Sequence, residues 1–331
     1  MGLRSYVLKR SIYTVVLLFF VITLNFLIFR VMPGTQAAIA GLVGTSKVPQ
    51  ELLEQLAKSY GIGEPLWDQY RKYIVNMLTF NWGFSFSTGQ PVYDEMIGSG
   101  RFVNTLVLLG TSTTIALLIG TLLGVLVAAR RGGLFDNFWV TTSLTTFSLP
   151  TFWMGIMFLS VFYTTLGWFP RSGTIPSAWE QFGKPPFLEE LFVRLQYLFL
   201  PALTLTLFFY GGNLLITRST MLETLSEDYV TTARAKGLNQ RVILFKHALR
   251  NASLPLVTNA ALQYGFILSG AIITETVFGW KGLGTWIFDS VGGKDFPVMQ
   301  ALFFIIGLMV IIANFASDLI YGVLDPRIKY D

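Results

Sequence analysis

The sequence contains no cysteine and only one histidine, His247, among its 331 residues. The missing cysteine excludes a disulfide framework, a thiolate metal site and a cysteine nucleophile. One histidine disfavours a histidine-based metal site or proton relay. Charge is also scarce, because 13% of the residues are charged, whereas a soluble domain carries about 25%. The shortage of charge points to lipid as the solvent of much of the chain.

What the chain has in quantity is apolar residues, at 53%. They are gathered into six long runs, and a bilayer core needs roughly 20 apolar residues per helix. The predicted spans cover about 11–31, 102–129, 137–166, 195–217, 251–274 and 296–320. The sequence therefore predicts an all-α integral membrane protein, with six transmembrane helices in a single domain over 1–331.

The first apolar run has a second interpretation as a signal peptide. Cations precede it, and Ala38–Ala40 has the small residues of a cleavage site. The apolar region of a signal peptide is about 7–15 residues long, and this run is longer. We favour an uncleaved first helix and keep cleavage as the alternative.

The distribution of charge predicts the topology. With the N-terminus inside, the inner segments hold 13 cations and 7 acids of the 24 and 19 in the chain, which leaves 11 cations and 12 acids outside. This asymmetry follows the positive-inside rule, so both termini are predicted to be cytoplasmic. The formal charge of +5 is explained by loops facing anionic lipid, and no nucleic acid is expected as a partner.

Two outer segments are predicted. Residues 32–100 form a cap outside the membrane, with amphipathic helices at Pro49–Ala57 and Pro65–Leu78. One face of the second helix carries Trp67, Tyr70, Tyr73 and Ile74. The Pro- and Gly-rich segment from Pro170 to Arg194 is expected to be an irregular loop.

Within the spans, three features predict how the helices pack. Gly120 and Gly124 form a G-x-x-x-G pair, which lets two helices approach closely. Pro150 is expected to break or kink the third span, and Gly211–Gly212 the fourth. Asn25 in the first span is expected to hydrogen-bond a neighbouring helix.

The sequence shows no means of driving transport by itself. It lacks the G-x-x-x-x-G-K-[ST] loop that cradles ATP phosphates. Only Glu275 and Asp318 are expected near the bilayer among ionisable residues, each at a span end, with Asp318 as a helix-end contact. No catalytic residue, metal ligand or bound cofactor is predicted, and the solute-binding residues are left open.

The most structured inner segment is the loop over 218–250, which we call the coupling loop. Ser226 is predicted to cap a helix, Gly237 to end it and Asn239 to cap a second helix that leads to Asn251 and Pro255 at the start of the fifth span. The predicted apolar stripe of the first helix is Leu222, Leu225, Tyr229 and Ala233. A small helix of this kind suits the groove of another protein, and a position on lipid headgroups is the alternative.

The coupling loop resembles that of ABC-importer permeases, with the best match in the dipeptide/oligopeptide branch. The resemblance rests on Asp228–Leu238 and His247–Ala252, and it extends along nearly the whole chain. Further matching segments are Pro33–Gly34, Tyr60–Leu66, Asn104–Leu106, Arg130–Gly132, Ser148–Trp153, Leu166–Pro170, Thr274–Phe278, Gly282–Gly284 and Tyr321–Arg327. One departure is Thr231–Ala233, where the broad importer motif has Glu-Ala-Ala, so a glutamate-specific salt bridge is not expected.

The resemblance implies a type I importer permease fold and half of a translocation pathway for di- and oligopeptides. It implies a second, different permease, an extracytoplasmic solute-binding protein and two cytoplasmic ATPases that bind ATP and Mg²⁺. The residues that would dock the ATPase are Asp228, Tyr229, Val230, Thr231, Thr232, Ala233, Arg234, Ala235, Lys236 and Gly237. Import of oligosaccharides by the same machinery is the first alternative, and a stand-alone ion-coupled transporter is the second.

Overall fold

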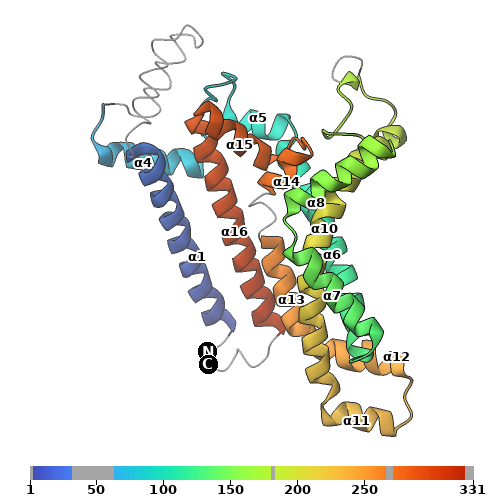
Figure 1. Cartoon of the computed structure of the whole chain (residues 1–331). Coiled ribbons are helices and arrows are strands. Elements are labelled where there is room, and N and C mark those ends of the chain that lie inside the picture. Colours follow the sequence, from blue (N-terminus) through green and yellow to red (C-terminus); the bar gives the residue numbers. More distant parts are fainter. Residues whose placement is uncertain (1–2, 32–62, 180–182, 266–270, 325–331) are drawn as a thin grey trace.

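The computed structural model describes residues 3–31, 63–179, 183–265 and 271–324 (Figure 1). This part of the chain is helical and has no named strand, with a single isolated bridge between Phe84 and Pro91. Four of its helices are long and apolar enough to cross a membrane, and a bent pair makes a fifth span if counted as one. The predicted all-α membrane fold is confirmed, while the count of six spans stays a prediction.

The long helices are α1 (Leu3–Phe26), α6 (Arg101–Ala129), α10 (Phe187–Leu225), α13 (Leu249–Gly265) and α16 (Phe296–Leu324). The shorter elements are η1 (Leu27–Val31), α4 (Leu66–Leu78), α5 (Val92–Gly98), α7 (Leu134–Ser148), α8 (Thr151–Phe158), η2 (Leu159–Thr165), α11 (Asp228–Ala235), α12 (Gln240–Val242), η3 (Ile243–Ala248), α14 (Ile272–Val277) and α15 (Leu283–Gly293). Elements α11 and α12 lie at one end of the molecule, and α4, α5 and α15 lie at the other (Figure 1).

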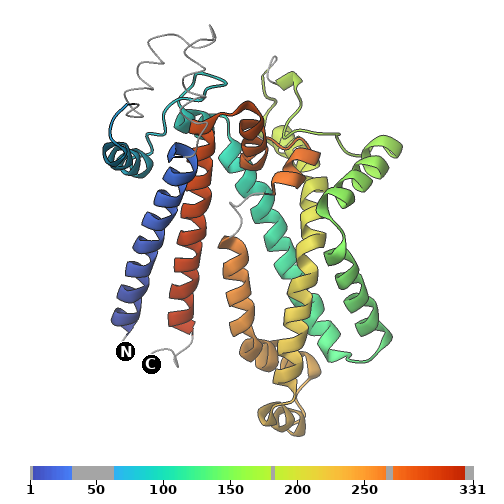
Figure 2. The ribbon, with the colours of Figure 1, turned by 60° about the vertical axis from the view of Figure 1, so that its left-hand side comes forward.

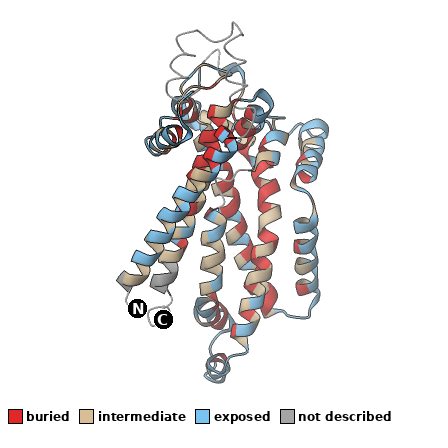
Figure 3. Cartoon of the chain, turned by 90° about the vertical axis from the view of Figure 1, so that its left-hand side faces the viewer, coloured by how far each residue is buried: buried red, intermediate tan, exposed pale blue. Residues whose placement is uncertain are grey.

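The long helices pack against one another as a series of neighbouring pairs. Helix α1 packs on α16, α16 on α13, and α13 on α10, which also packs along α6 (Figure 2). Buried residues are dense on the inner helices and at the end near α4, whereas the helix beside the N label is largely exposed or intermediate (Figure 3). Large apolar side chains on that exposed face are the expected pattern in lipid.

The closest helix contact joins α6 and α10. A Cβ added at Gly120 would lie 2.6 Å from the Cβ of Asn213, and one added at Gly124 would lie 2.5 Å from the Cβ of Thr217. The tight packing predicted from the glycine pair is confirmed. Asn25 likewise behaves as predicted, because its amide Nδ2 donates to the carbonyl of Gln300 on α16 over 2.9 Å.

Pro150 breaks the third span as predicted. Helices α7 and α8 meet at an angle of 99° across it, and Leu149 before the proline is extended, as steric contact with the proline ring requires. At Gly211–Gly212 the sequence predicted a break or a kink; a break is wrong, because α10 runs unbroken through the pair, and a kink stays a prediction. Gly211 serves a close approach instead, since an added Cβ would lie 2.7 Å from the carbonyl oxygen of Ser143 on α7.

The predicted outer loop ends earlier than expected, because α10 begins at Phe187. The fifth span also differs from its prediction: the helix continues from η3 into α13 and passes through Pro255, so Asn251 and Pro255 do not start it. The helical turns before these residues already hold the backbone in a helical conformation, so no new helix has to start at Pro255. Helix α13 ends at Gly265 and α14 begins at Ile272.

Part of the predicted cap lies within the described residues. Helix α4 matches its predicted range, and Tyr73 and Met77 pack in one cluster with Ile22 of α1 and Phe304 of α16. The ring of Trp67 lies 5.9 Å from that of Tyr70, so the two share a face as predicted, although Trp67 is 67% exposed and the buried row of the helix runs through Gln69, Tyr73 and Met77. The predicted helix at Pro49–Ala57 and the cleavage-site residues lie outside the described residues.

We expect Gly124→Ala to destabilise the protein by about 1–3 kcal/mol, because the added methyl group overpacks the α6–α10 contact. Gly110→Ala on the same helix is the matched control, since an added Cβ there meets nothing within 4 Å and alanine favours the helix by about 0.5–1 kcal/mol. Thermal unfolding in detergent compares the two variants. Equal melting temperatures would contradict the packing role of Gly124.

Candidate functional site

The coupling loop forms a helix–turn–helix at one end of the molecule (Figure 1). Helix α10 ends at Leu225, and after a turn at Ser226 and Glu227 the chain forms α11. Elements α12 and η3 then lead directly into α13. The loop therefore connects the ends of two long helices through short, well-defined elements.

The predicted glycine elbow at the end of α11 is confirmed. Gly237 has φ +71°, and its N–H donates to the carbonyl of Arg234 over 2.9 Å, while the N–H of Leu238 donates to Ala233 over 3.3 Å. This pair of bonds is the Schellman motif, which satisfies the last carbonyls of a helix. A Cβ at Gly237 would meet nothing within 4 Å, so glycine is needed there for its backbone conformation alone.

The start of α11 differs from the prediction. Ser226 closes α10, where its Oγ donates to the carbonyl of Glu223 over 2.6 Å, and the residue before α11 is Glu227, which makes no side-chain cap. The reason is that α10 runs through the residues assigned to the new helix. The second predicted cap is confirmed, because Asn239 Oδ1 accepts from the N–H of Arg241 over 2.9 Å.

Two residues attach α11 to the rest of the chain. Val230 and Ala233 are buried in one cluster with Ile243 of η3, and Leu225 of α10 packs against it. The predicted stripe is wrong at Tyr229, which is 39% exposed, because the turn at Ser226 rotates α11 relative to α10. The spacing of Val230 and Ala233, three residues apart, is nonetheless that of one helix face.

The opposite face of α11 is free within the described structure. Of the ten predicted docking residues, the exposed ones are Asp228, Tyr229, Thr231, Thr232, Arg234, Ala235, Lys236 and Gly237. An eight-residue helix is not stable alone in water. A short helix held by two apolar side chains, with small and mixed-charge residues outward, can seat in a groove of another protein.

A partly buried ion pair fixes the base of the loop. Arg218 of α10 donates from Nε to Asp136 Oδ1 over 2.7 Å and from Nη2 to Oδ2 over 2.8 Å. The N–H of Gly132 donates to the same Oδ2 over 2.8 Å. The carboxylate thereby ties the α6–α7 turn to α10. The sequence indicated these charges only as inner ones, because no local spacing links residues this far apart.

The carboxylates Glu275 and Asp318, which lie at opposite ends of the bundle, have structural partners. Glu275 is fully buried; its Oε1 accepts from Thr105 Oγ1 over 2.8 Å and its Oε2 from the N–H of Thr285 over 3.1 Å. At the other end of the bundle, Arg10 Nη1 lies 3.0 Å from Asp318 Oδ2, so the predicted helix-end contact is confirmed. Neither carboxylate lies along an apolar helix middle.

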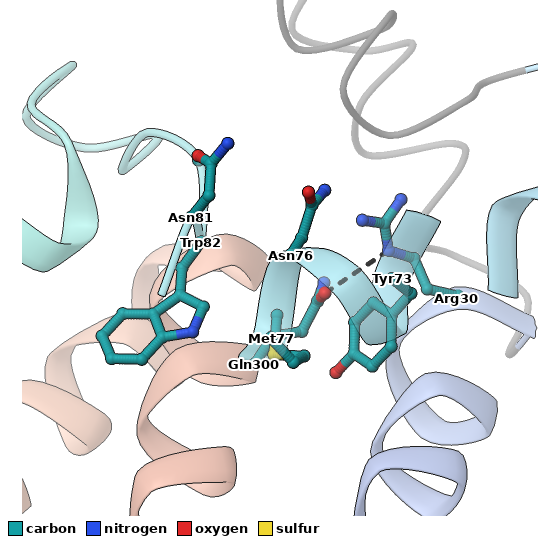
Figure 4. Close-up of a pocket in the computed structure, with 8 residues that line it drawn as sticks. Arg30, Tyr73, Asn76, Met77, Asn81, Trp82 and Gln300 are labelled. Atoms are coloured by element: carbon teal, nitrogen blue, oxygen red, sulfur yellow. Dashed lines mark hydrogen bonds between the residues drawn. The ribbon is translucent and has the colours of Figure 1, made fainter. Parts of the chain in front are cut away.

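The sequence analysis missed one further charge, Arg30. It is buried in η1, in a small pocket between η1, α4 and α16, where its Nε donates to Gln300 Oε1 over 3.3 Å (Figure 4). Its guanidinium also lies 5.7 Å from the ring centroid of Tyr73. The signal that could have identified Arg30 in the sequence is its position in the last turn of the first apolar run. Within the described ranges, no group of three or more His, Cys, Asp or Glu could hold a metal ion.

The chain matches two family models. Residues 120–330 match "Binding-protein-dependent transport system inner membrane component", and residues 3–109 match the N-terminal membrane component of the same systems. Curated relatives include a di/tripeptide transport system permease protein of Pseudomonas aeruginosa, 35% identical over 98% of this chain and 99% of its own length. An oligopeptide transport system permease protein of Bacillus subtilis is 34% identical over 99% and 100%. A glutathione transport system permease protein of Escherichia coli is 34% identical over 98% and 99%.

We expect Asp136→Ala to destabilise the protein by about 1.5–3 kcal/mol, because Arg218 loses its two charge-assisted hydrogen bonds in a partly buried site. The Asp136 side chain is 3% exposed and that of Arg218 is 26% exposed. Glu190→Ala is the control, since the Glu190–Arg194 pair is more open and such pairs contribute about 0–1 kcal/mol. Thermal unfolding measures both, and equal losses would contradict the anchoring role of Asp136.

Proposed function

The chain belongs to the family of inner membrane components of binding-protein-dependent transport systems, and from this membership we propose that it forms half of a pathway importing di- and oligopeptides. It is a multi-pass permease subunit of an ABC importer and not an enzyme, with ATP hydrolysed on separate ATPase subunits. A solute-binding protein completes such a system. Two relatives that are 34–35% identical to this chain are named as permeases for di/tripeptides and for oligopeptides. These names support peptides as the solute.

The second half of the pathway is a different, homologous permease. Both termini of this chain lie on the cytoplasmic side. The start of α1, the end of α16 and the helix α11 lie at the same end of the molecule (Figure 1), and the inner segments hold the excess of cations. ATP and Mg²⁺ bind to the ATPases, and this chain holds no cofactor of its own.

The observation that carries the coupling role is the geometry of α11. Of the ten predicted residues, the eight exposed ones form the surface that docks a cytoplasmic ATPase, while the buried Val230 and Ala233 join the helix to Ile243 and Leu225. A displacement of α11 is thereby passed to α10 through the short turn and to α13 through η3. The Asp136–Arg218 pair extends the moving body to α7.

Movement of these helices as one body is what alternating access needs. Closure of the two ATPases draws their docked helices together, and the attached spans rock so that the pathway opens to alternate sides. The turn at Gly237 fixes the direction of α11. A displacement of α11 by the docked ATPase therefore reaches α10 and α13 and does not bend the loop.

The first experiment is purification of this chain from its native host in mild detergent, followed by mass spectrometry. A second permease and one or two ATPases with phosphate-binding loops are the expected companions. Liposomes containing the complex and the binding protein are then tested for ATP-driven uptake of peptides and of oligosaccharides. Uptake of oligosaccharides only would overturn the peptide assignment, and transport by this chain alone without ATP would overturn the importer assignment.

We expect Gly237→Pro to reduce the solute transported per ATP hydrolysed at least about tenfold, because proline fixes φ near −65° and lacks the N–H that bonds Arg234. Gly237→Asn is the control, since asparagine tolerates a positive φ and keeps that N–H. Uptake and ATP hydrolysis are measured together in liposomes. Normal transport by the proline variant would contradict the role of the elbow.

A further inference from the structure

Three amide side chains meet between α10 and α13 at the depth of the apolar spans. Asn213 Oδ1 accepts from Asn259 Nδ2 over 2.7 Å and from Gln263 Nε2 over 2.9 Å. Asn213 Nδ2 donates to Gln263 Oε1 over 3.2 Å and to the carbonyl of Phe209 over 3.1 Å. Polar groups at this depth are costly in lipid, so they face the bundle interior or a water-filled path.

The three amides differ in how many of their hydrogen-bonding groups are already engaged. Asn213 is buried, and the four bonds engage both of its N–H groups and both lone pairs of its oxygen. Asn259 and Gln263 are only partly buried. Asn259 Oδ1 and one N–H of each side chain have no hydrogen-bond partner among the described residues. Asn213 thus orients two amides that each keep spare hydrogen-bonding capacity.

An apolar groove lies along the part of α13 that precedes Gln263. It has a volume of about 350 Å³ between α6 and α13, with Leu118 and Leu122 on one wall and Leu256 and Ala260 on the other. Gln263 follows Leu256 by seven residues and Ala260 by three, so it lies on the groove face of α13. The volume is in the range of small-molecule sites.

A pair of hydroxyl groups bridges the two walls at one end of the groove. The Oγ1 of Thr114 lies 2.6 Å from the OH of Tyr264, and both residues are exposed. Thr114 is one turn before Leu118 and Tyr264 one turn after Ala260, so the pair closes the groove toward the α14–α15 end. Thr114 Oγ1 also donates to the carbonyl of Gly110 over 2.6 Å, so the Tyr264 hydroxyl donates to Thr114 and the pair keeps oxygen lone pairs as acceptors.

We propose that Asn259, Gln263 and the Thr114–Tyr264 pair line the translocation pathway and hydrogen-bond the main chain of a peptide in transit. Every peptide unit carries one donor and one acceptor, which neutral amides match whatever the side chains are. The apolar groove accepts those side chains. Because neutral hydrogen bonds contribute little each, the peptide is guided without being retained. The inference rests on the proposed function of peptide import.

The absence of cysteine from this chain allows a direct test. Gln263→Cys and the control Leu262→Cys, at a neighbour that is 41% exposed on another face of α13, are each assembled into the complete transporter in liposomes. A charged, membrane-impermeant thiosulfonate reagent is added during ATP turnover, with and without saturating peptide and binding protein. Labelling of this chain is read by mass spectrometry.

We expect the Gln263→Cys variant to react at least about tenfold faster than the Leu262→Cys variant, because thiolate chemistry needs water. We also expect peptide to slow the labelling of the Gln263→Cys variant alone. A thiol at position 263 that does not react, or that peptide does not protect, would overturn the proposal. If the Gln263→Cys variant does not assemble, Thr114→Cys gives the same reading at the other wall. Wild-type liposomes without ATP-driven peptide uptake would overturn the proposed function instead.

A second measurement separates contact from helix packing. Gln263→Leu is expected to lower peptide uptake about fivefold, which corresponds to the loss of one neutral hydrogen bond to the peptide. Gln263→Asn, which keeps an amide, is expected to restore part of the uptake. Equal uptake by the leucine variant and the wild type would contradict the contact with peptide.

Discussion

The contact between α6 and α10 is the constraint on which the rest of the structure depends. In lipid, apolar side chains gain nothing by leaving one apolar neighbour for another, so helices associate through close backbone approach and a few polar bonds. Gly120 and Gly124 provide that approach against Asn213 and Thr217. The long helix α10 held in this way carries the contacts to α7 through Gly211, to α13 through Asn213 and to the coupling loop through Leu225.

The same arrangement explains why the coupling loop can be small. Helix α11 is too short to be stable by itself, and two buried side chains suffice because the elements that they touch are already fixed. The Schellman bonds at Gly237 remove the freedom that remains at its end. A small rigid element on a rigid helix transmits displacement, whereas a long flexible loop would absorb it.

Patterns of local chemistry were predicted well from the sequence. The apolar runs predicted the membrane fold, Pro150 the bend, the G-x-x-x-G pair the tight contact, and Gly237 and Asn239 the two ends within the coupling loop. Errors arose where a longer element overrode a local signal. Ser226 reads as a helix start, yet α10 extends to it, and Pro255 reads as a helix start, yet the helix is already formed. The pairs Asp136–Arg218 and Asn213–Gln263 join distant segments, so no spacing along the chain could reveal them.

The distribution of polar groups across the molecule follows a physical logic. Charged side chains lie toward the ends of the bundle and are engaged there, as in the Asp136–Arg218 and Arg10–Asp318 pairs and the hydrogen bonds to Glu275. Between those ends the described helices present neutral amides and hydroxyls. An unpaired charge midway would hold an oppositely charged terminus of a peptide strongly in a site with little water, whereas neutral groups exchange partners at low cost. Fixed ends with a neutral middle therefore suit the movement of the spans as one body that we propose for peptide import.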